Sequence, residues 1–147
     1  MGTRSTTKFI EKYTDNVTKT KKTQKLMAMY RQMDGYPEGH GKDLADFLKN
    51  GVLVNGYSMG EKRKKVFNGV GCMAAQVVKH FKKGTGNIHI TTLSDKQEYN
   101  YEVIGDFDTK ELTLIARDSN GRVLFNGHPK DYNAFLKRLK KEKENKG

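Results

Sequence analysis

The hydrophobic pattern changes period near the middle of the chain, and this change restricts the folds that the sequence can adopt. From Asn68 to about Lys83, apolar residues recur at the spacing of one helix face. After residue 86, four short strand-like segments alternate with turn signals, of which Asn120-Gly121 is the strongest. Helices grouped in one part of the chain and hairpin-linked strands in another predict an α+β fold with a mostly antiparallel sheet.

The remaining segments complete a predicted order of three helices and about six strands. Besides the helix at 68–83, the pattern predicts strands at 7–13, 26–33, 87–93, 98–105, 111–118 and 122–126, a helix at 42–50 and a last helix from Pro129. Residues 14–25 are expected to be a polar loop or a frayed hairpin end, and the charged residues 140–147 to be solvated or frayed. We therefore predict a single domain over residues 1–147 with the order β-β-α-α-β-β-β-β-α.

The charge balance favours an anionic partner. The 147 residues include 28 lysines and arginines against 17 aspartates and glutamates, a formal net charge of +11. This balance suits nucleic acid, a nucleotide, an acidic protein or a membrane surface, and a soluble lysine-rich protein would show it as well. The positive charge is concentrated in residues 1–33, 59–86 and 129–147, which either converge on one surface or stay apart.

Cysteine content and hydropathy indicate the compartment. Cys72 is the only cysteine, which excludes an internal disulfide and indicates a reducing environment. No apolar run approaches the roughly 20 residues of a membrane helix, and no secretory signal is visible. We expect a protein of a reducing cytoplasm with no membrane partner, and a homo-oligomer remains open.

The segment from Met29 to Lys42 has the strongest functional character in the chain. It contains three glycines, a proline and two tyrosines, and glycine and proline together fix an unusual backbone path. Ordered loops that display charged side chains are common positions for binding and catalysis. The side chains expected to be displayed here are those of Arg31, Asp34, Tyr36, Glu38 and His40.

Glu38 and His40 are the candidate catalytic residues of this loop. A carboxylate beside a histidine can transfer protons, and Arg31 can hold a phosphate, so these residue types suit phosphodiester cleavage. A structural interpretation is that Asp34-Gly35 is a simple turn and that Glu38 and His40 border the following helix. A small phosphodiesterase or ribonuclease is therefore kept as an alternative function, with no catalytic residue assigned.

Glycine-rich turns precede both middle helices and indicate an anion-binding site. The turns are Gly39-His40-Gly41 and Asn68-Gly69-Val70-Gly71, with Asn68 expected as an N-cap. Helix N-termini present unpaired N–H groups and a positive dipole end, and glycine lets a ligand approach the backbone. Together with Arg4 and Arg31, the two turns would line one phosphate or nucleotide pocket. Tight packing of the backbone would also select such glycines.

The sequence predicts neither a metal nor a cofactor, and it leaves nucleic acid as a further alternative. No histidine pairs with another histidine or with Cys72 at a usual zinc spacing. The basic run at 62–65 and the C-terminal lysines could bind nucleic acid without sequence preference, with Tyr30, Tyr36 and Tyr57 able to stack on bases. No recognised nucleic-acid-binding module is present.

Three blocks of sequence are distinctive enough to be compared with known families. They are the start Met1-Gly2-Thr3-Arg4-Ser5, the block Met29-Tyr30-Arg31-Gln32 with Asp34-Gly35-Tyr36-Pro37-Glu38-Gly39-His40-Gly41, and the block Phe67-Asn68-Gly69 with Gly71-Cys72 and Ala74-Ala75-Gln76. In these blocks, over roughly residues 1–90, the chain resembles a family of small uncharacterised proteins of bacteriophages and bacteria. The resemblance implies a phage accessory protein that acts in the infected cell, where such proteins bind a host factor or capture a nucleotide immune signal.

These observations lead to one expected function. We expect a host-takeover or counter-defence binding protein that captures a phosphate-bearing ligand such as a nucleotide, or docks on an acidic host protein, without turnover. The expected ligand-binding residues are Arg4, Arg31, Asp34, Tyr36, His40, Gly41, Asn68, Gly69 and Gly71.

Overall fold

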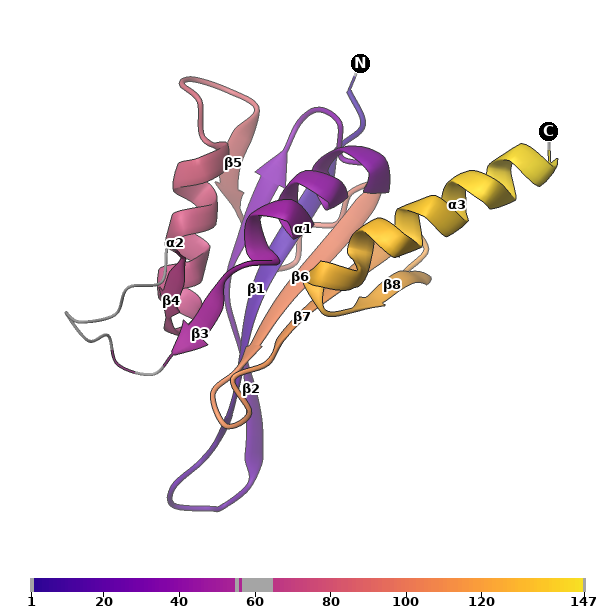
Figure 1. Cartoon of the computed structure of the whole chain (residues 1–147). Helices are drawn as coiled ribbons and strands as arrows, with labels where there is room; N and C mark the ends of the chain where they lie inside the picture. The colour runs from indigo at the N-terminus through magenta and orange to yellow at the C-terminus, as the bar shows by residue number, and fades with distance from the viewer. Residues whose placement is uncertain (1, 55, 57–64, 147) are drawn as a thin grey trace.

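The computed structural model describes residues 2–54, 56 and 65–146 and contains a six-stranded sheet covered by helices on one side (Figure 1). Its strands are β1 (Ser5–Thr14), β2 (Lys21–Arg31), β5 (Ile88–Thr91), β6 (Tyr99–Asp106), β7 (Leu112–Asp118) and β8 (Val123–Gly127). The helices are α1 (Lys42–Leu48), α2 (Gly69–Phe81) and α3 (Tyr132–Lys146), and a small second sheet consists of β3 (Val52–Val54) and β4 (Val66–Asn68). The predicted α+β class is confirmed.

The strands of the large sheet follow the order β5-β2-β1-β6-β7-β8. β1 and β6 run parallel, whereas the other neighbouring pairs are antiparallel. The β1–β2 pair contains a register shift between Phe9 and Ile10. Because β1 and β6 are central neighbours, the start of the chain lies directly beside its C-terminal half.

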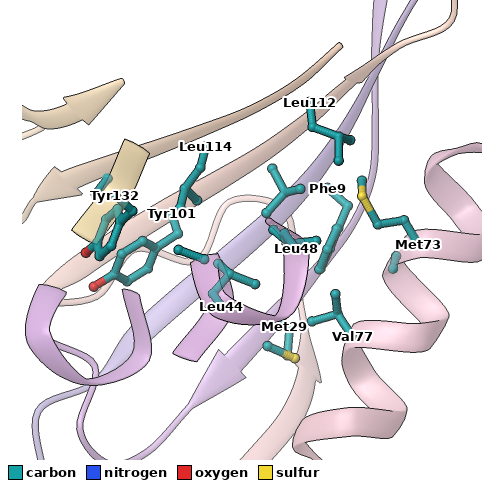
Figure 2. Close-up of a cluster of buried hydrophobic side chains, with 14 of the residues drawn as sticks. Phe9, Met29, Leu44, Leu48, Met73, Val77, Tyr101, Leu112, Leu114 and Tyr132 are labelled. Carbon is teal, nitrogen blue, oxygen red and sulfur yellow. The ribbon is translucent and has the colours of Figure 1, made fainter. Parts of the chain in front are cut away.

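Side chains alternate along the strands and divide the sheet into a covered face and an open face. On the covered face, Phe9, Met29 and Leu114 are fully buried and pack with Leu44 of α1 and Val77 of α2 (Figure 2). α1 lies over the centre of the sheet, with α2 and α3 on either side of it (Figure 1). This single core positions the predicted functional loop, which enters α1 directly.

The open face carries polar side chains, one small apolar cluster and a crossing segment. The apolar cluster consists of Ile10, Ile104 and Ile115. Residues 92–98, here called the crossover segment, connect edge strand β5 to β6, and β2 and β1 lie between these two strands. The Thr6 hydroxyl and the Gln97 N–H both donate to Asn100 Oδ1, at 2.7 and 3.0 Å. The crossover segment therefore covers part of the open face and buries Thr6.

Regular structure extends further than predicted at two places. Residues 14–25 were expected to be a polar loop or a frayed hairpin end, and β2 begins at Lys21, so Lys21–Lys25 is paired strand at the end of the β1–β2 hairpin. Lys21 Nζ forms ion pairs with Asp106 and Asp108, at 2.8 and 2.7 Å, which hold this end of the hairpin beside the β6–β7 turn. The charged end, expected to be solvated or frayed, is exposed to solvent over residues 140–145 and is helical as far as Lys146, because lysine and glutamate favour helix even without apolar neighbours.

Two short features have no counterpart in the sequence prediction. β3 and β4 pair in parallel, and a π-helical turn over Pro37–Gly41 precedes α1. The basic run at 62–65 lies outside the described residues except for Lys65, and so does Tyr57. In the part of the chain that the structure describes, no helix is both long enough and apolar enough to cross a membrane.

Candidate functional site

The predicted functional loop is an ordered turn that buried side chains fix against the sheet. Asp34 has a left-handed φ of 60°, and the π-helical turn after it continues without a break into α1. The Tyr101 hydroxyl donates to the Gly35 carbonyl at 2.7 Å. The Tyr132 hydroxyl donates to the Pro37 carbonyl at 2.8 Å. The Pro37 carbonyl also accepts from the Lys42 N–H within the π-helical turn. The two tyrosine bonds tie the loop to β6 and α3.

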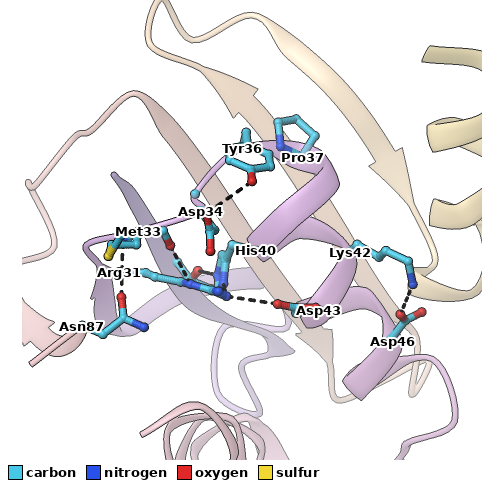
Figure 3. Close-up of polar contacts among 12 residues, drawn as sticks. Arg31, Met33, Asp34, Tyr36, Pro37, His40, Lys42, Asp43, Asp46 and Asn87 are labelled. Carbon is cyan, nitrogen blue, oxygen red and sulfur yellow. Dashed lines mark hydrogen bonds and ion pairs between the residues drawn. The ribbon is translucent and has the colours of Figure 1, made fainter. Parts of the chain in front are cut away.

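His40 lies at the centre of this arrangement and is completely buried. Its Nδ1 is 3.0 Å from Arg31 Nη1 (Figure 3). Its Nε2 is 2.7 Å from Thr7 Oγ1. Arginine can only donate, so Nδ1 accepts and the ring proton lies on Nε2, which donates to Thr7. Burial, and then the Arg31 charge, lower the pKa of His40 to about 3. His40 is therefore a neutral link between the loop and strands β1 and β2.

Arg31 is held by three groups around its guanidinium (Figure 3). Nε donates to the Met33 carbonyl at 2.8 Å, and Nη1 contacts His40 and, at 3.4 Å, the Asp43 carboxylate. The guanidinium carbon lies 5.8 Å from the centre of the Phe81 ring, near the C-terminal end of α2. The side chain is 12% exposed, so the charge is oriented by the protein but keeps one edge at the surface.

A cleft of about 450 Å³ begins at Arg31 and separates α1 from the C-terminal half of α2. We call it the α1–α2 cleft, and its lining includes Arg31, Asp43, Asp46, Phe47, Lys65, His80, Phe81 and Lys83. The rings of Phe47 and His80 are in contact, with centres 4.5 Å apart and planes tilted by 34°, and Lys65 Nζ lies 4.4 Å from the centre of the Phe47 ring. Asp46 is already paired with Lys42 and Lys49, which leaves the cleft with an excess of positive groups.

Glu38 and His40 do not form an acid–base pair. Glu38 Oε2 lies 2.6 Å from Lys143 Nζ of α3, at the surface, whereas the His40 ring points into the core. Residues two positions apart in a helical turn lie on different sides of it, so proximity in sequence did not produce proximity of side chains. Neither residue lines the α1–α2 cleft.

Replacement of Glu38 by glutamine is expected to leave the protein nearly unchanged. The Glu38–Lys143 pair is exposed, with side chains 43% and 63% accessible, and such pairs contribute about 0–1 kcal/mol. We therefore expect Glu38→Gln to change the free energy of unfolding, measured by urea denaturation, by no more than about 1 kcal/mol. A large loss of stability, or loss of a bound ligand, would instead give Glu38 a role that its position does not indicate.

The second glycine-rich turn lies far from Arg31. Asn68 and Gly69 stand at the N-terminal end of α2, and Phe81 at its other end packs beneath Arg31. A helix of this length separates its two ends by roughly 20 Å. The Asn68 side chain does not cap α2 as predicted, because its Oδ1 accepts from the Gly56 N–H at 2.9 Å. A single pocket that unites Arg31 and His40 with Asn68, Gly69 and Gly71 is therefore not formed.

The other predicted ligand-binding residues are divided between the surface and the core. Tyr36 and Asp34 are exposed, and the Tyr36 hydroxyl donates to Asp34 Oδ1 at 3.3 Å. Gly41 is buried against the rings of Tyr101 and Tyr132. Arg4 is exposed, and its N–H lies 3.5 Å from Glu98 beside the crossover segment. Among the described residues, no group of three histidine, cysteine, aspartate or glutamate side chains could hold a metal ion.

Several residues of the α1–α2 cleft were not found by sequence reasoning. In the sequence, Phe47 and Phe81 are typical of the apolar face of a helix, and Lys83 is typical of the C-terminal end of a helix, where the dipole favours cations. Thr7, whose hydroxyl accepts the hydrogen bond from His40 Nε2, carries no sequence signal at all. The only available signal was the clustering of His80 with Lys79, Lys82 and Lys83 at one end of a predicted helix, which the helix dipole explains equally well.

The comparisons with known proteins give no match: no protein-family model matches the chain, and the searches of curated proteins and of solved structures find no similar protein.

Proposed function

We propose that this chain is a binding protein that holds a phosphate-bearing ligand, such as a nucleotide, in the α1–α2 cleft without converting it. The observation that carries the proposal is Arg31, whose guanidinium is oriented at the cleft by Met33 and His40. A guanidinium fixed in this way loses little conformational entropy when it binds two phosphate oxygens. Its contact with Asp43 is long, at 3.4 Å, so an incoming phosphate can compete with that carboxylate.

The rest of the cleft supports the nucleotide as the ligand class. Lys65 and Lys83 add positive charge around the same opening. The adjacent rings of Phe47 and His80 line the cleft, and base stacking on such rings contributes about 1–3 kcal/mol per base. The cleft volume of about 450 Å³ falls within the roughly 300–1,000 Å³ of small-molecule sites.

The positions of the two candidate catalytic residues support binding without turnover. A general base must lie within hydrogen-bond reach of the proton that it removes. His40 is neutral, and both of its ring nitrogens are already bonded inside the core. Glu38 is paired with Lys143 on another side of the loop. An enzyme acting in this cleft would need other groups for proton transfer.

The resemblance to phage and bacterial proteins supports a biological setting for this binding activity. Capture of a nucleotide immune signal inside an infected bacterial cell requires affinity and slow release, and it requires no chemistry. The net charge of +11 favours association with anions in general. We therefore propose counter-defence by ligand capture, in preference to docking on an acidic host protein.

Lys83→Ala is expected to weaken nucleotide retention about tenfold, because a charge-assisted contact to phosphate is lost. Lys83 is exposed in the cleft, so its replacement should not disturb folding. The matched control is Lys130→Ala, which removes an exposed lysine from the turn before α3. The measurement is incubation with a panel of linear and cyclic nucleotides, followed by desalting, denaturation and chromatography of the released ligand.

Each alternative function gives a different result in this experiment. Recovery of a chemically altered nucleotide would show turnover and support the phosphodiesterase. Equal weakening by Lys83→Ala and Lys130→Ala would mean that only net charge matters. Binding to polynucleotides that falls steeply with salt, without retention of nucleotides, would support nucleic-acid binding. Retention of no nucleotide at all would leave docking on an acidic protein as the better explanation.

A further inference from the structure

A second charged cavity lies on the open face of the sheet, away from the α1–α2 cleft. It has a volume of about 290 Å³ and is bounded by β1, β2, β6 and β7, with the crossover segment on one side and the β7–β8 turn on another. Its charged lining consists of Lys8, Lys25, Lys96, Glu102, Arg117 and Asp118. We call it the open-face pocket.

The carboxylates of this pocket are already engaged by other groups. Glu102 accepts from Arg117 Nε at 2.7 Å. Asp118 Oδ1 accepts from the N–H groups of Asn120 and Arg122, at 2.9 and 3.0 Å, and thereby builds the β7–β8 turn. Asp95 of the neighbouring crossover segment accepts from Thr91 and Gln97. These acidic groups therefore serve the local structure.

The three lysines, in contrast, have no such partners. Within the described residues, none of Lys8, Lys25 and Lys96 lies within 4 Å of a carboxylate. Lys8 is half-buried on central strand β1. Burial and the charges of Lys25 and Lys96 lower its pKa more than the nearby carboxylates of Glu102 and Asp95 raise it. Three ammonium groups that converge on one cavity repel one another, and an anion placed between them would remove that repulsion.

We propose that the open-face pocket binds a small oxyanion with two or more negative charges, either free phosphate or pyrophosphate or the phosphate group of a small metabolite. Three converging ammonium groups match several negatively charged oxygens. The cavity volume, near the lower limit of roughly 300 Å³ for small-molecule sites, suits a compact anion and leaves little space for a base. Arg117, fixed by Glu102 and by the Gly121 carbonyl, contributes a fourth cation at the rim.

This site is independent of the proposed nucleotide site. Thr7 and Phe9 point to the covered face, so Lys8 between them points to the open face. The sheet itself therefore separates the two sites. Changes at Lys8 should leave nucleotide retention in the α1–α2 cleft unaffected, and failure of either proposal leaves the other intact.

The test is a calorimetric titration of the full chain with sodium pyrophosphate at constant ionic strength. We expect one binding event for the unmodified protein and a loss of affinity of about tenfold or more for Lys8→Gln. Lys12→Gln is the matched control, because Lys12 lies on the same strand and face but does not line the pocket. Both variants have the same net charge, so long-range attraction is equal. A parallel titration with a phosphate monoester distinguishes an inorganic anion from a phosphorylated metabolite.

Thermal unfolding supplies a second readout. Pyrophosphate should raise the melting temperature of the unmodified protein and of Lys12→Gln, and it should raise that of Lys8→Gln much less, because only native protein with an intact site gains from the ligand. Lys96→Gln, on the exposed crossover segment, tests the same pocket without changing the sheet. Absence of binding at about 10 mM, or equal losses in Lys8→Gln and Lys12→Gln, would overturn the proposal.

Discussion

Gly41→Ala is expected to destabilise the protein by about 2–4 kcal/mol, through overpacking combined with the loss of a buried hydrogen bond. An alanine methyl group at this position would overlap the Tyr132 hydroxyl and approach the Tyr101 ring to 3.1 Å. Tyr132 is fully buried, so its ring cannot turn away into solvent. Displacement of the ring would break its bond to the Pro37 carbonyl and leave the buried Tyr132 hydroxyl without this acceptor.

Gly71→Ala is the matched control for this prediction. Gly71 lies in the first turn of α2 with helical backbone, and a methyl group there would meet no neighbour within 4 Å. Alanine is the better helix former, so we expect unchanged stability or a gain of up to about 1 kcal/mol. Equilibrium urea unfolding of both variants is the measurement. Similar midpoints for the two alanine variants would show that the loop does not depend on close packing against Tyr132.

Periodicity was sufficient to predict most of the secondary structure. The apolar stripe from Val70 to Phe81 predicted α2, and alternation with turn signals predicted strands β6, β7 and β8. These are local signals, because each element buries one face and repeats with its own period. The paired strand at Lys21–Lys25 carries no apolar alternation, and its backbone pairing therefore had no sequence signature.

The candidate site was harder to predict because it depends on contacts between distant segments. The parallel pairing of β1 with β6 places Thr7 and Tyr101 beneath the loop, and no local pattern encodes that pairing. His40 looked like an accessible partner of Glu38, yet the helical turn directs it inward to Thr7. Polar loop residues in a sequence show where chemistry could occur, whereas the strands beneath them decide which side chains reach solvent.

The burial of His40 also predicts that the protein loses stability as the pH falls from 6.5 towards 4.5. The pKa of His40 is about 3 in the folded protein, against an ordinary value of 6.5 in the unfolded chain. Above pH 6.5 the ring is neutral in both states and contributes no pH dependence. Below pH 6.5 the unfolded chain binds a proton that the folded protein excludes, so the free energy of unfolding falls by roughly 1.4 kcal/mol per pH unit, about 2–3 kcal/mol in total by pH 4.5.

His40→Gln separates this effect from other titrating groups. Glutamine has a donor and an acceptor for Thr7 and Arg31 but does not titrate, so we expect a less stable protein at pH 7 with a flatter pH dependence. His80 and His128, whose pKa values are also lowered mainly by burial, would account for the residual slope. The measurement is urea unfolding at half-unit intervals between about pH 4.5 and pH 7.5, the interval in which an ordinary histidine titrates. If the free energy of unfolding depends on pH in the same way for the variant and the unmodified protein, His40 is protonated as readily in the folded state as in the unfolded chain. That result would contradict the buried hydrogen bonds of His40 to Thr7 and Arg31.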